Sequence, residues 1–303
     1  MVKVITNLAI YPIIIPQKQF NDRFGNPNAF IDMNPSIFID GEGKMTIFIR
    51  RIDYQKFQDK KFVLYNNYSN SEYAILEGKI EETSRLQLDN FDFHELTYDY
   101  GRSIYRTYWK GPEDIRFIDK NSVLVTVPEC NPSGQPCIFL ANIENKILKN
   151  FTLCEPSDVE KNWMPFYDIF GNRKVIYSVY PLLIKSVEKA EFQTINHNLA
   201  ELNDYHGSTN GIEIGENRLF LIHINQERTY HRWFKINLIT NSVTISETFV
   251  FFKYSYIEFP ISIAKYNDRI FISMGVNDKM SYIVEISMKT IDFSEDGVSE
   301  VDL

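Results

Sequence analysis

The chain alternates short apolar runs with polar turns along most of its length. Five times, two runs rich in β-branched and aromatic residues flank a polar turn of four residues, a pattern typical of a β-hairpin. No long amphipathic helical pattern separates these hairpins, so the sequence predicts an all-β protein. The paired runs are 36–40 with 45–49, 115–118 with 123–127, 166–170 with 175–179, 211–214 with 219–224, and 261–265 with 270–274.

The spacing of these hairpins indicates a repeat. The turns of the last four begin at residues 119, 171, 215 and 267, so the interval between them is 52, 44 and 52 residues. Those intervals are close to the ~40–50 residues of one four-stranded propeller blade. The chain of 303 residues is therefore predicted to be a single five-bladed β-propeller domain over 1–303. A β-sandwich is the alternative.

The first interval is longer, because the first turn begins at residue 41. The extra length falls on 53–108, a segment rich in Tyr, Asn, Asp and Glu, and predicts an insertion in the first-blade region. We expect this insertion to form outer strands and a loop over one face. The N-terminal run, 4–15, is expected to pair with the last blade and close the ring, which removes exposed strand edges.

Composition narrows the classes of function. A net charge of -8 disfavours a protein that binds nucleic acid by neutralising phosphates. The three cysteines are an odd number without C-x-x-C spacing, and no convincing D-x-D motif occurs, so no metal site and no cofactor are expected. No apolar run approaches the roughly 20 residues of a membrane span. A reduced, cytoplasmic location is the expectation.

Polar residues collect at one end of every predicted hairpin. Since the start of the first strand and the end of the second lie at the same end, these residues should converge on one propeller face. Carboxylates, bases and aromatic rings at one rim are typical of a site for a ligand with many hydroxyls. The residues are Asn34, Asp114, Lys161, Asn162, Trp163, His206 and Glu258 before first strands, and Arg50, Tyr177, Ser178, His223 and Asp278 after second strands.

Each of these residues also has a simpler interpretation. Asp114 could be a turn carboxylate paired with Arg116, and Lys161 a solvated lysine. Trp163 could belong to the core. His223 lies in an apolar run, where a buried structural histidine is common.

Taken together, several segments resemble the five-bladed propeller enzymes of glycoside hydrolase family 130, the β-mannoside phosphorylases and hydrolases. They resemble still more closely a related set of glycosyltransferase-like proteins and propeller-fold β-mannosyltransferases. The most specific segment is Glu-Lys-Asn-Trp-Met-Pro-Phe at 160–166. The others are Asn-Pro-Ser at 34–36, Ile-Phe-Ile-Arg at 47–50, Glu-Asp-Ile-Arg at 113–116, Ile-Tyr-Ser-Val-Tyr-Pro at 176–181, Arg-Thr-Tyr-His-Arg at 228–232 with His223, and Gly-Val-Asn-Asp at 275–278.

This resemblance implies roles for individual residues. Asp114 takes the place of the catalytic acid, with Asn34, Arg50, Lys161, His223 and Asp278 in the sugar or anion pocket. Further candidates for substrate binding are Asn162, Trp163, Tyr177, Ser178, His206, Arg228, Tyr230, His231, Arg232 and Glu258.

Two departures from the family pattern bear on the activity. Ile115 replaces a proline after the catalytic Asp. Tyr177 and Ser178 stand where phosphorylases carry His-Arg-Pro, so one phosphate-binding arginine is missing. This departure favours a transferase or a hydrolase over a phosphorylase.

The leading functional hypothesis from the sequence is an inverting glycosyltransferase that moves a mannose-like sugar from an activated donor to a carbohydrate acceptor. The donor would be a nucleotide sugar or a sugar phosphate. Asp114 would be the general base. Arg50, Lys161 and His223, with Arg228 or Arg232, would stabilise the departing phosphate. Flat faces for the sugar would come from Trp163, Tyr177 and Tyr230.

Two alternatives remain open. The first is a β-glycoside phosphorylase or hydrolase with Asp114 as general acid at the same site. A hydrolase would need a second carboxylate to activate water, for which Glu258 and Asp278 are the candidates. The second alternative is a non-catalytic glycan-binding propeller, in which Asp114 would be dispensable.

Overall fold

The computed structural model describes residues 3–56, 62–82, 84–102, 104–154, 159–189 and 191–293. Regular structure in these ranges consists of β-strands and short 3₁₀ turns, which confirms the all-β prediction. The segment 53–108, predicted to be an insertion, is described apart from 57–61, 83 and 103.

The first two antiparallel groups of strands share one nine-stranded sheet. A short parallel pairing of Thr97 with Ile147 and Tyr98 with Leu148 joins their outer strands. The first group, in spatial order, is β5 (Ile31–Ile39), β6 (Lys44–Ile52), β9 (Ser69–Lys79) and β10 (Asp92–Tyr98), with β11 (Trp109–Lys110) also paired to β9. The second is β12 (Glu113–Asp119), β13 (Ser122–Thr126), β14 (Ile138–Glu144) and β15 (Ile147–Leu153).

Three further sheets follow along the chain. The next contains β16 (Met164–Tyr167), β17 (Arg173–Val179), β18 (Leu182–Ser186) and β19 (Phe192–Ile195). The one after it contains β20 (His206–Gly207), β21 (Ile212–Ile214), β22 (Asn217–Asn225), β23 (Thr229–Asn237), β24 (Val243–Ile245), β25 (Phe249–Val250) and β1 (Lys3–Val4). The last contains β26 (Glu258–Tyr266), β27 (Arg269–Val276), β28 (Met280–Ser287) and β2 (Ala9–Pro12). Two small hairpins, β3 (Gln19–Asn21) with β4 (Pro27–Ala29) and β7 (Tyr54–Lys56) with β8 (Phe62–Leu64), stand apart.

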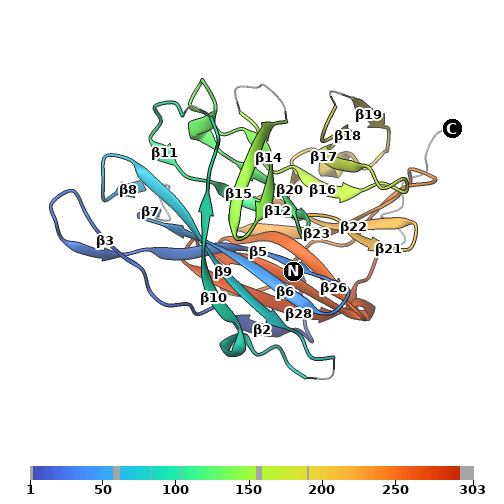
Figure 1. Cartoon of the computed structure of the whole chain (residues 1–303). Coiled ribbons are helices and arrows are strands. Elements are labelled where there is room, and N and C mark those ends of the chain that lie inside the picture. Colours follow the sequence, from blue (N-terminus) through green and yellow to red (C-terminus); the bar gives the residue numbers. More distant parts are fainter. Residues whose placement is uncertain are drawn as a thin grey trace.

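All five hairpins predicted from the sequence are confirmed. They are the pairs β5–β6, β12–β13, β16–β17, β21–β22 and β26–β27. The expected pairing of the N-terminal run with the last sheet is also confirmed, since β2 runs antiparallel to β28. Figure 1 shows the blue N-terminal strands beside the orange and red C-terminal ones.

The hydrophobic core is divided among the interfaces between successive strand groups. Phe48 packs with Phe117 and Phe139 between the first group and the second. Leu124 packs with Trp163 and Val175 between the second and the third. Comparable clusters join the third group to the fourth, the fourth to the last, and the last to the first through Ile47 and Phe271. This order returns to its start, so apolar burial closes the strand groups into a ring.

Hydrogen bonds between the innermost strands complete this ring. Ile37 N donates to Ser262 Oγ (2.6 Å) and Ile263 N to Asn210 Oδ1 (3.0 Å). Gly211 N donates to Pro165 O (2.7 Å), and Arg116 Nε to Ser208 O (2.6 Å). These bonds hold the inner strands and the segment 208–211 next to one another.

Candidate active site

Asp114 lies at a distortion of the inner strand β12. The pairing of β12 with β13 shifts register between Glu113 and Arg116, and Asp114 itself has a φ of 46°. Asn34 in the inner strand β5 repeats this arrangement, with a register shift at the same place and a φ of 46°. Left-handed φ is uncommon outside glycine, and short polar side chains tolerate it best. Such distortion of a strand often accompanies function.

Two side chains from the first strand group hold the Asp114 carboxylate. Asn34 Nδ2 donates to Asp114 Oδ1 (3.3 Å), and Arg50 Nη1 donates to the same oxygen (3.3 Å). Arg50 also forms an ion pair with Glu113 through Nη2 and Oε1 (2.9 Å), and its Nε donates to Ser71 Oγ (2.9 Å). Arg50 is buried, whereas the side chain of Asp114 keeps 19% of its surface exposed. The carboxylate is thus fixed on one side and open on the other.

Three positive charges act on Asp114. Burial acts to raise the pKa of Asp114, but the charges of Arg50, Arg116 and Lys161 and the bond from Asn34 outweigh it and hold that pKa below its ordinary value. Asp114 is therefore ionised at neutral pH in the unliganded protein. Lys161 is exposed, and no ion-pair partner for it occurs within the described ranges.

Lys161 and Asn162 are presented by a segment that is anchored on both sides. Glu160 is buried and accepts from Trp163 Nε1 (2.9 Å) and from the Tyr177 hydroxyl (2.7 Å). Trp163 is 1% exposed. Between these anchors Asn162 has a φ of 63°, and its Oδ1 lies 3.5 Å from Arg116 Nη2. Burial at 160 and 163 thus turns 161 and 162 toward Asp114.

His223 is buried and is connected to Arg116 through Ser208, whose carbonyl accepts from Arg116 Nε. Its Nδ1 lies 2.6 Å from Ser208 Oγ, and its ring centroid is 5.9 Å from that of His206 on the neighbouring strand. Burial, together with the charges of His231, His206 and Arg116, lowers the pKa of His223 to about 3. His223 is therefore a neutral hydrogen-bonding group across the physiological pH range.

The sequence missed four residues that belong to this site. Arg116 follows Asp114 by two residues, a spacing that could have placed both on one face of the strand. Glu113 was noted only as part of the segment 113–116, and Ser208 was given no role. Tyr54 gave no sequence signal, because it lies in the segment 53–108. Burial and the charges of Glu113, Asp114 and Asp278 raise the pKa of Tyr54 to about 12 against the opposing effect of Arg50, which puts Asp278 in the same electrostatic neighbourhood.

Ile115, which departs from the family pattern, is accommodated by a hydrogen bond. Its backbone N–H donates to the hydroxyl of buried Tyr73 (3.3 Å). A proline has no N–H to donate. At this position the backbone is therefore held by a hydrogen bond from Ile115 N–H, where a proline would restrict φ.

Glu258 is not available as a second catalytic carboxylate. It is 0% exposed and accepts from Phe251 N (2.8 Å), Phe252 N (2.9 Å), Ser255 Oγ, Arg228 Nη2 (3.1 Å) and His231 Nε2 (3.1 Å). A carboxylate has about four lone-pair positions, all of which are used here. Glu258, Arg228 and His231, which the sequence suggested for substrate binding, are bonded to one another in this structure, and the Glu258 carboxylate is left without a free acceptor position.

Several aromatic and basic candidates are also turned away from the site. Trp163 and Tyr230 are 1% and 7% exposed, so neither offers a free ring face to a sugar. The Tyr177 hydroxyl is bound to Glu160. Arg232 donates to the Tyr205 hydroxyl (3.1 Å) and to Ser246 O (3.1 Å). Ser178 lies in β17 opposite Leu183, and no contact in the described part of the chain joins it to Asp114.

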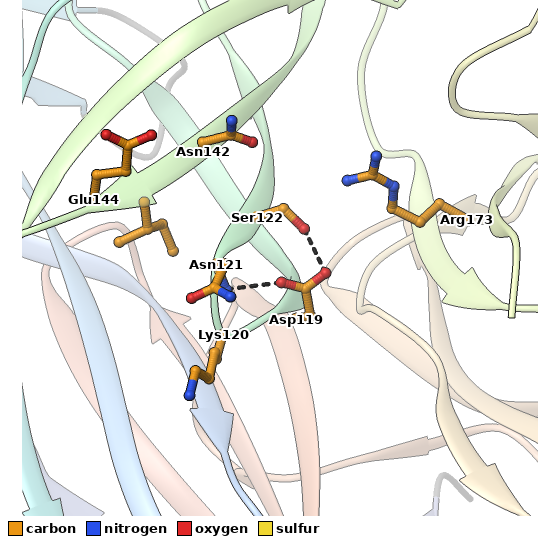
Figure 2. Close-up of a pocket in the computed structure, with 8 residues that line it drawn as sticks. Asp119, Lys120, Asn121, Ser122, Asn142, Glu144 and Arg173 are labelled. Carbon is orange, nitrogen blue, oxygen red and sulfur yellow. Dashed lines mark hydrogen bonds between the residues drawn. The ribbon is translucent and has the colours of Figure 1, made fainter.

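A pocket of about 560 Å³ lies at the opposite end of the β12–β13 hairpin. Figure 2 shows Asp119 bonded to Asn121 and Ser122 there, with Arg173 across from them. Asp119 also accepts from the Tyr167 hydroxyl (2.5 Å). None of the residues expected in the active site lines this pocket.

The described ranges lack two features that would point to other kinds of function. They contain no group of three or more His, Cys, Asp or Glu side chains placed to hold a metal ion. Nor do they contain a helix with the length and apolar character needed to cross a membrane.

Comparison by sequence identifies no relative: no protein-family model matches the chain, and no curated protein does. Comparison by structure finds many solved structures of similar fold. The β-1,2-mannobiose phosphorylase of Listeria innocua, solved with β-1,2-mannobiose, matches 94% of this chain and 98% of its own with a TM-score of 0.60 at 14% identity. A second structure comes from work on the GH130 mannoside phosphorylases, among them glycoside hydrolases that target β-1,2-mannosidic linkages in Candida mannan. It covers 97% of this chain and 99% of its own, with a TM-score of 0.60 at 12% identity.

A glycosyl hydrolase of Bacteroides ovatus also matches, over 91% of each chain, with a TM-score of 0.59 at 9% identity. At such identities the likeness concerns the fold and not the chemistry. The chain therefore shares an all-β, propeller-like fold with mannoside phosphorylases and glycosidases of family GH130.

Proposed function

We propose that this protein is a β-glycoside phosphorylase that acts on a β-mannosidic linkage, with Asp114 as its general acid and base. Its scaffold would be one five-bladed propeller domain, with 53–108 inserted in the first-blade region. The strand order and the closed series of apolar interfaces support that architecture. The observation that carries the function is the placing of one partly exposed carboxylate among the charges of Arg50, Arg116 and Lys161.

The proposed reaction balances without a metal or redox partner. Protonated Asp114 gives its proton to the glycosidic oxygen, and the bond from that oxygen to the anomeric carbon breaks. An oxygen of hydrogen phosphate attacks the anomeric carbon from the opposite face, which forms a sugar 1-phosphate with inverted configuration. The proton lost by the phosphate then restores the acid form of Asp114.

The cations serve both the phosphate and the proton transfer. In the unliganded protein they favour the ionised form of Asp114, which suits the reverse reaction, where Asp114 accepts a proton from the acceptor hydroxyl. A bound phosphate dianion would offset the same charges and raise the pKa of Asp114, which favours the acid needed for phosphorolysis. Phosphate binding is therefore expected to be accompanied by proton uptake.

The glycosyltransferase hypothesis loses support from the structure. Arg228 and Arg232, the additional groups suggested for holding a donor diphosphate, donate to internal partners, so that Arg50, Lys161 and His223 are left for that role. The proteins of similar fold are named as phosphorylases and hydrolases. The alternative hypothesis, a β-glycoside phosphorylase or hydrolase at the same site, is therefore better supported than the glycosyltransferase.

Product analysis tests the proposal. The protein is incubated with β-1,2-mannobiose, with and without inorganic phosphate, and separately with GDP-mannose and mannose. We expect mannose 1-phosphate to form only when phosphate is present. Free mannose formed equally without phosphate would indicate a hydrolase with Asp278 activating water. Turnover restricted to the nucleotide sugar would restore the transferase, and binding without turnover would indicate a glycan-binding propeller.

A further inference from the structure

The peptide group between Asp114 and Ile115 lies in the bulge of β12. The pairing of β12 with β13 passes from Glu113 directly to Arg116, so the two residues between them are left out of the ladder. Ile115 is buried, and a buried N–H that has left its ladder needs another acceptor. The conformation of Asp114 therefore depends on what this peptide group binds.

Two side chains bind the peptide group, one from each side. The N–H of Ile115 donates to the hydroxyl of Tyr73 (3.3 Å), and the carbonyl of Asp114 accepts from Arg116 Nη1 (3.3 Å). Tyr73 is buried in β9, where it pairs with Arg50 of β6. Since both polar groups of the peptide are bonded, its orientation is fixed, and with it the backbone that carries the Asp114 carboxylate.

Strand β9 also holds the segment that leads to Asp114. Ser71 lies on the same face of β9 as Tyr73, and its Oγ donates to the carbonyl of Pro112 (2.6 Å). Gly111, with a φ of 84°, approaches the strand so closely that a Cβ there would lie 1.9 Å from Ser71 O. The segment 111–115 is therefore fixed on β9 at three places, and Tyr73 is the one nearest to Asp114.

The matching bulge in β5 shows why the Tyr73 hydroxyl is needed. There the register shifts between Met33 and Ser36, and Asn34 has the same φ of 46° as Asp114. The residue after Asn34 is Pro35, which has no N–H to satisfy. The bulge of β12 has a buried N–H at the equivalent position, and Tyr73 supplies its acceptor.

The Tyr73 hydroxyl stays neutral in this environment. Burial and the charge of Asp114 raise the pKa of Tyr73 against the opposing effect of Arg50. The hydroxyl therefore keeps its proton across the physiological pH range. It accepts from Ile115 N–H without placing a second negative charge beside Asp114.

We propose that Tyr73 is a positioning residue, whose hydroxyl holds the peptide between Asp114 and Ile115 and so keeps the Asp114 carboxylate bonded to Asn34 and Arg50. This inference rests on the proposed function, in which Asp114 is the acid and base. Without the hydroxyl the buried N–H of Ile115 loses its acceptor, and the peptide turns to find another. Because Tyr73 acts through Asp114, its loss affects the rate more than the binding of phosphate or sugar.

Kinetics of Tyr73→Phe with β-1,2-mannobiose and inorganic phosphate test the proposal. We expect kcat to fall about tenfold, the scale of one hydrogen bond, while both KM values stay within about twofold. Tyr167→Phe is the matched control, because it removes a hydroxyl that donates to Asp119 (2.5 Å) at the far end of the same strand. Each variant loses one hydrogen bond to β12, so both should melt at a lower temperature. Only Tyr73→Phe should lose turnover.

The pKa of Asp114 gives a second measurement, which does not depend on turnover. Carbon-13 NMR of the aspartate carboxyl carbons reports this pKa, and Asp114→Asn identifies the signal. In Tyr73→Phe the carboxylate moves away from Asn34 and Arg50, which lower its pKa, so we expect a higher pKa than in the wild type. The charged and titratable groups near Asp114 are Arg50, Arg116, Lys161, Glu113, Tyr54 and Tyr73.

The two measurements separate this inference from the proposed function. If the wild type forms mannose 1-phosphate and Tyr73→Phe has the same kcat as the wild type or as Tyr167→Phe, Tyr73 does not position Asp114 and the proposed function stands. If the wild type turns over no mannobiose, the proposed function fails, while a raised pKa of Asp114 in Tyr73→Phe still supports the positioning of the carboxylate. An unchanged pKa of Asp114 overturns the inference in either case.

Discussion

Asp114 and Glu258 are two carboxylates at corresponding places, each at the start of an innermost strand. Asp114 has 19% of its side chain exposed, and three positive charges, those of Arg50, Arg116 and Lys161, act on its single negative charge. Glu258 is completely buried, and five donors consume all its acceptor positions. Both have a pKa below the ordinary value although burial acts to raise it.

The difference teaches that a shifted pKa does not by itself identify a catalytic group. A structural ion-pair network lowers the pKa of a carboxylate as effectively as an active site does. What distinguishes Asp114 is that its partners leave one side open, and that its backbone is distorted to hold it there. Substitutions at the two positions should therefore affect different quantities.

The largest effect is expected for Asp114→Asn. Positioned acid–base catalysis is worth roughly 10²–10⁴-fold, so turnover of β-1,2-mannobiose with phosphate should fall by about that factor. The melting temperature should change little, because the amide has the same shape and can still accept from Asn34. Turnover and melting are measured on one preparation. Near-normal turnover would remove Asp114 from the mechanism and direct attention to Asp278.

Glu258→Gln should instead lower the free energy of unfolding. The amide of glutamine leaves Arg228 and His231 next to a neutral group, and it replaces one hydrogen-bond acceptor by a donor. The loss of one partner of a buried ion pair typically costs about 3–5 kcal/mol. Urea unfolding measures this loss. The folded fraction should retain most of its turnover, whereas a stable variant without turnover would mean that Glu258 acts in the chemistry.

The comparison also predicts a difference in acid stability. Because the pKa of Glu258 is lower in the folded protein than its ordinary value of 4.5, its charge stabilises the fold above that value. This contribution is lost as the pH falls through the folded-state pKa. The wild type should therefore lose more stability than Glu258→Gln between neutral and acid pH. Parallel unfolding curves for the two proteins would contradict the proposed role of the Glu258 network.

The sequence predicted the strands better than the site, for a physical reason. Hairpins are local, and the apolar runs and turn residues that specify them are adjacent in the chain. Asp114 and Lys161 could be placed on one rim by the same logic. The burial of each carboxylate could not be predicted. Nothing local distinguishes Glu258 from Asp114, because the N–H groups of Phe251 and Phe252 that donate to Glu258 lie outside its strand.

The segment 53–108 limited the prediction in another way. Its composition indicated outer strands, and β9 and β10 are outer strands of the first group. It gave no sign of Tyr54, which begins β7 and packs against Trp109, a residue distant in the sequence. Contacts of this kind require the three-dimensional arrangement of whole strand groups.

The smallest effect is expected for Lys161→Ala. Lys161 is exposed, and its charge is only one of three acting on Asp114. Its removal should raise the KM for phosphate by about tenfold, the scale of one charge-assisted hydrogen bond, and should change kcat less. Lys120→Ala is the matched control, because Lys120 is an exposed lysine at the far end of the β12–β13 hairpin and should leave the KM for phosphate unchanged. If the two variants have the same KM for phosphate, Lys161 does not bind it. The open side of Asp114 would then face the sugar alone, with phosphate held by the two arginines.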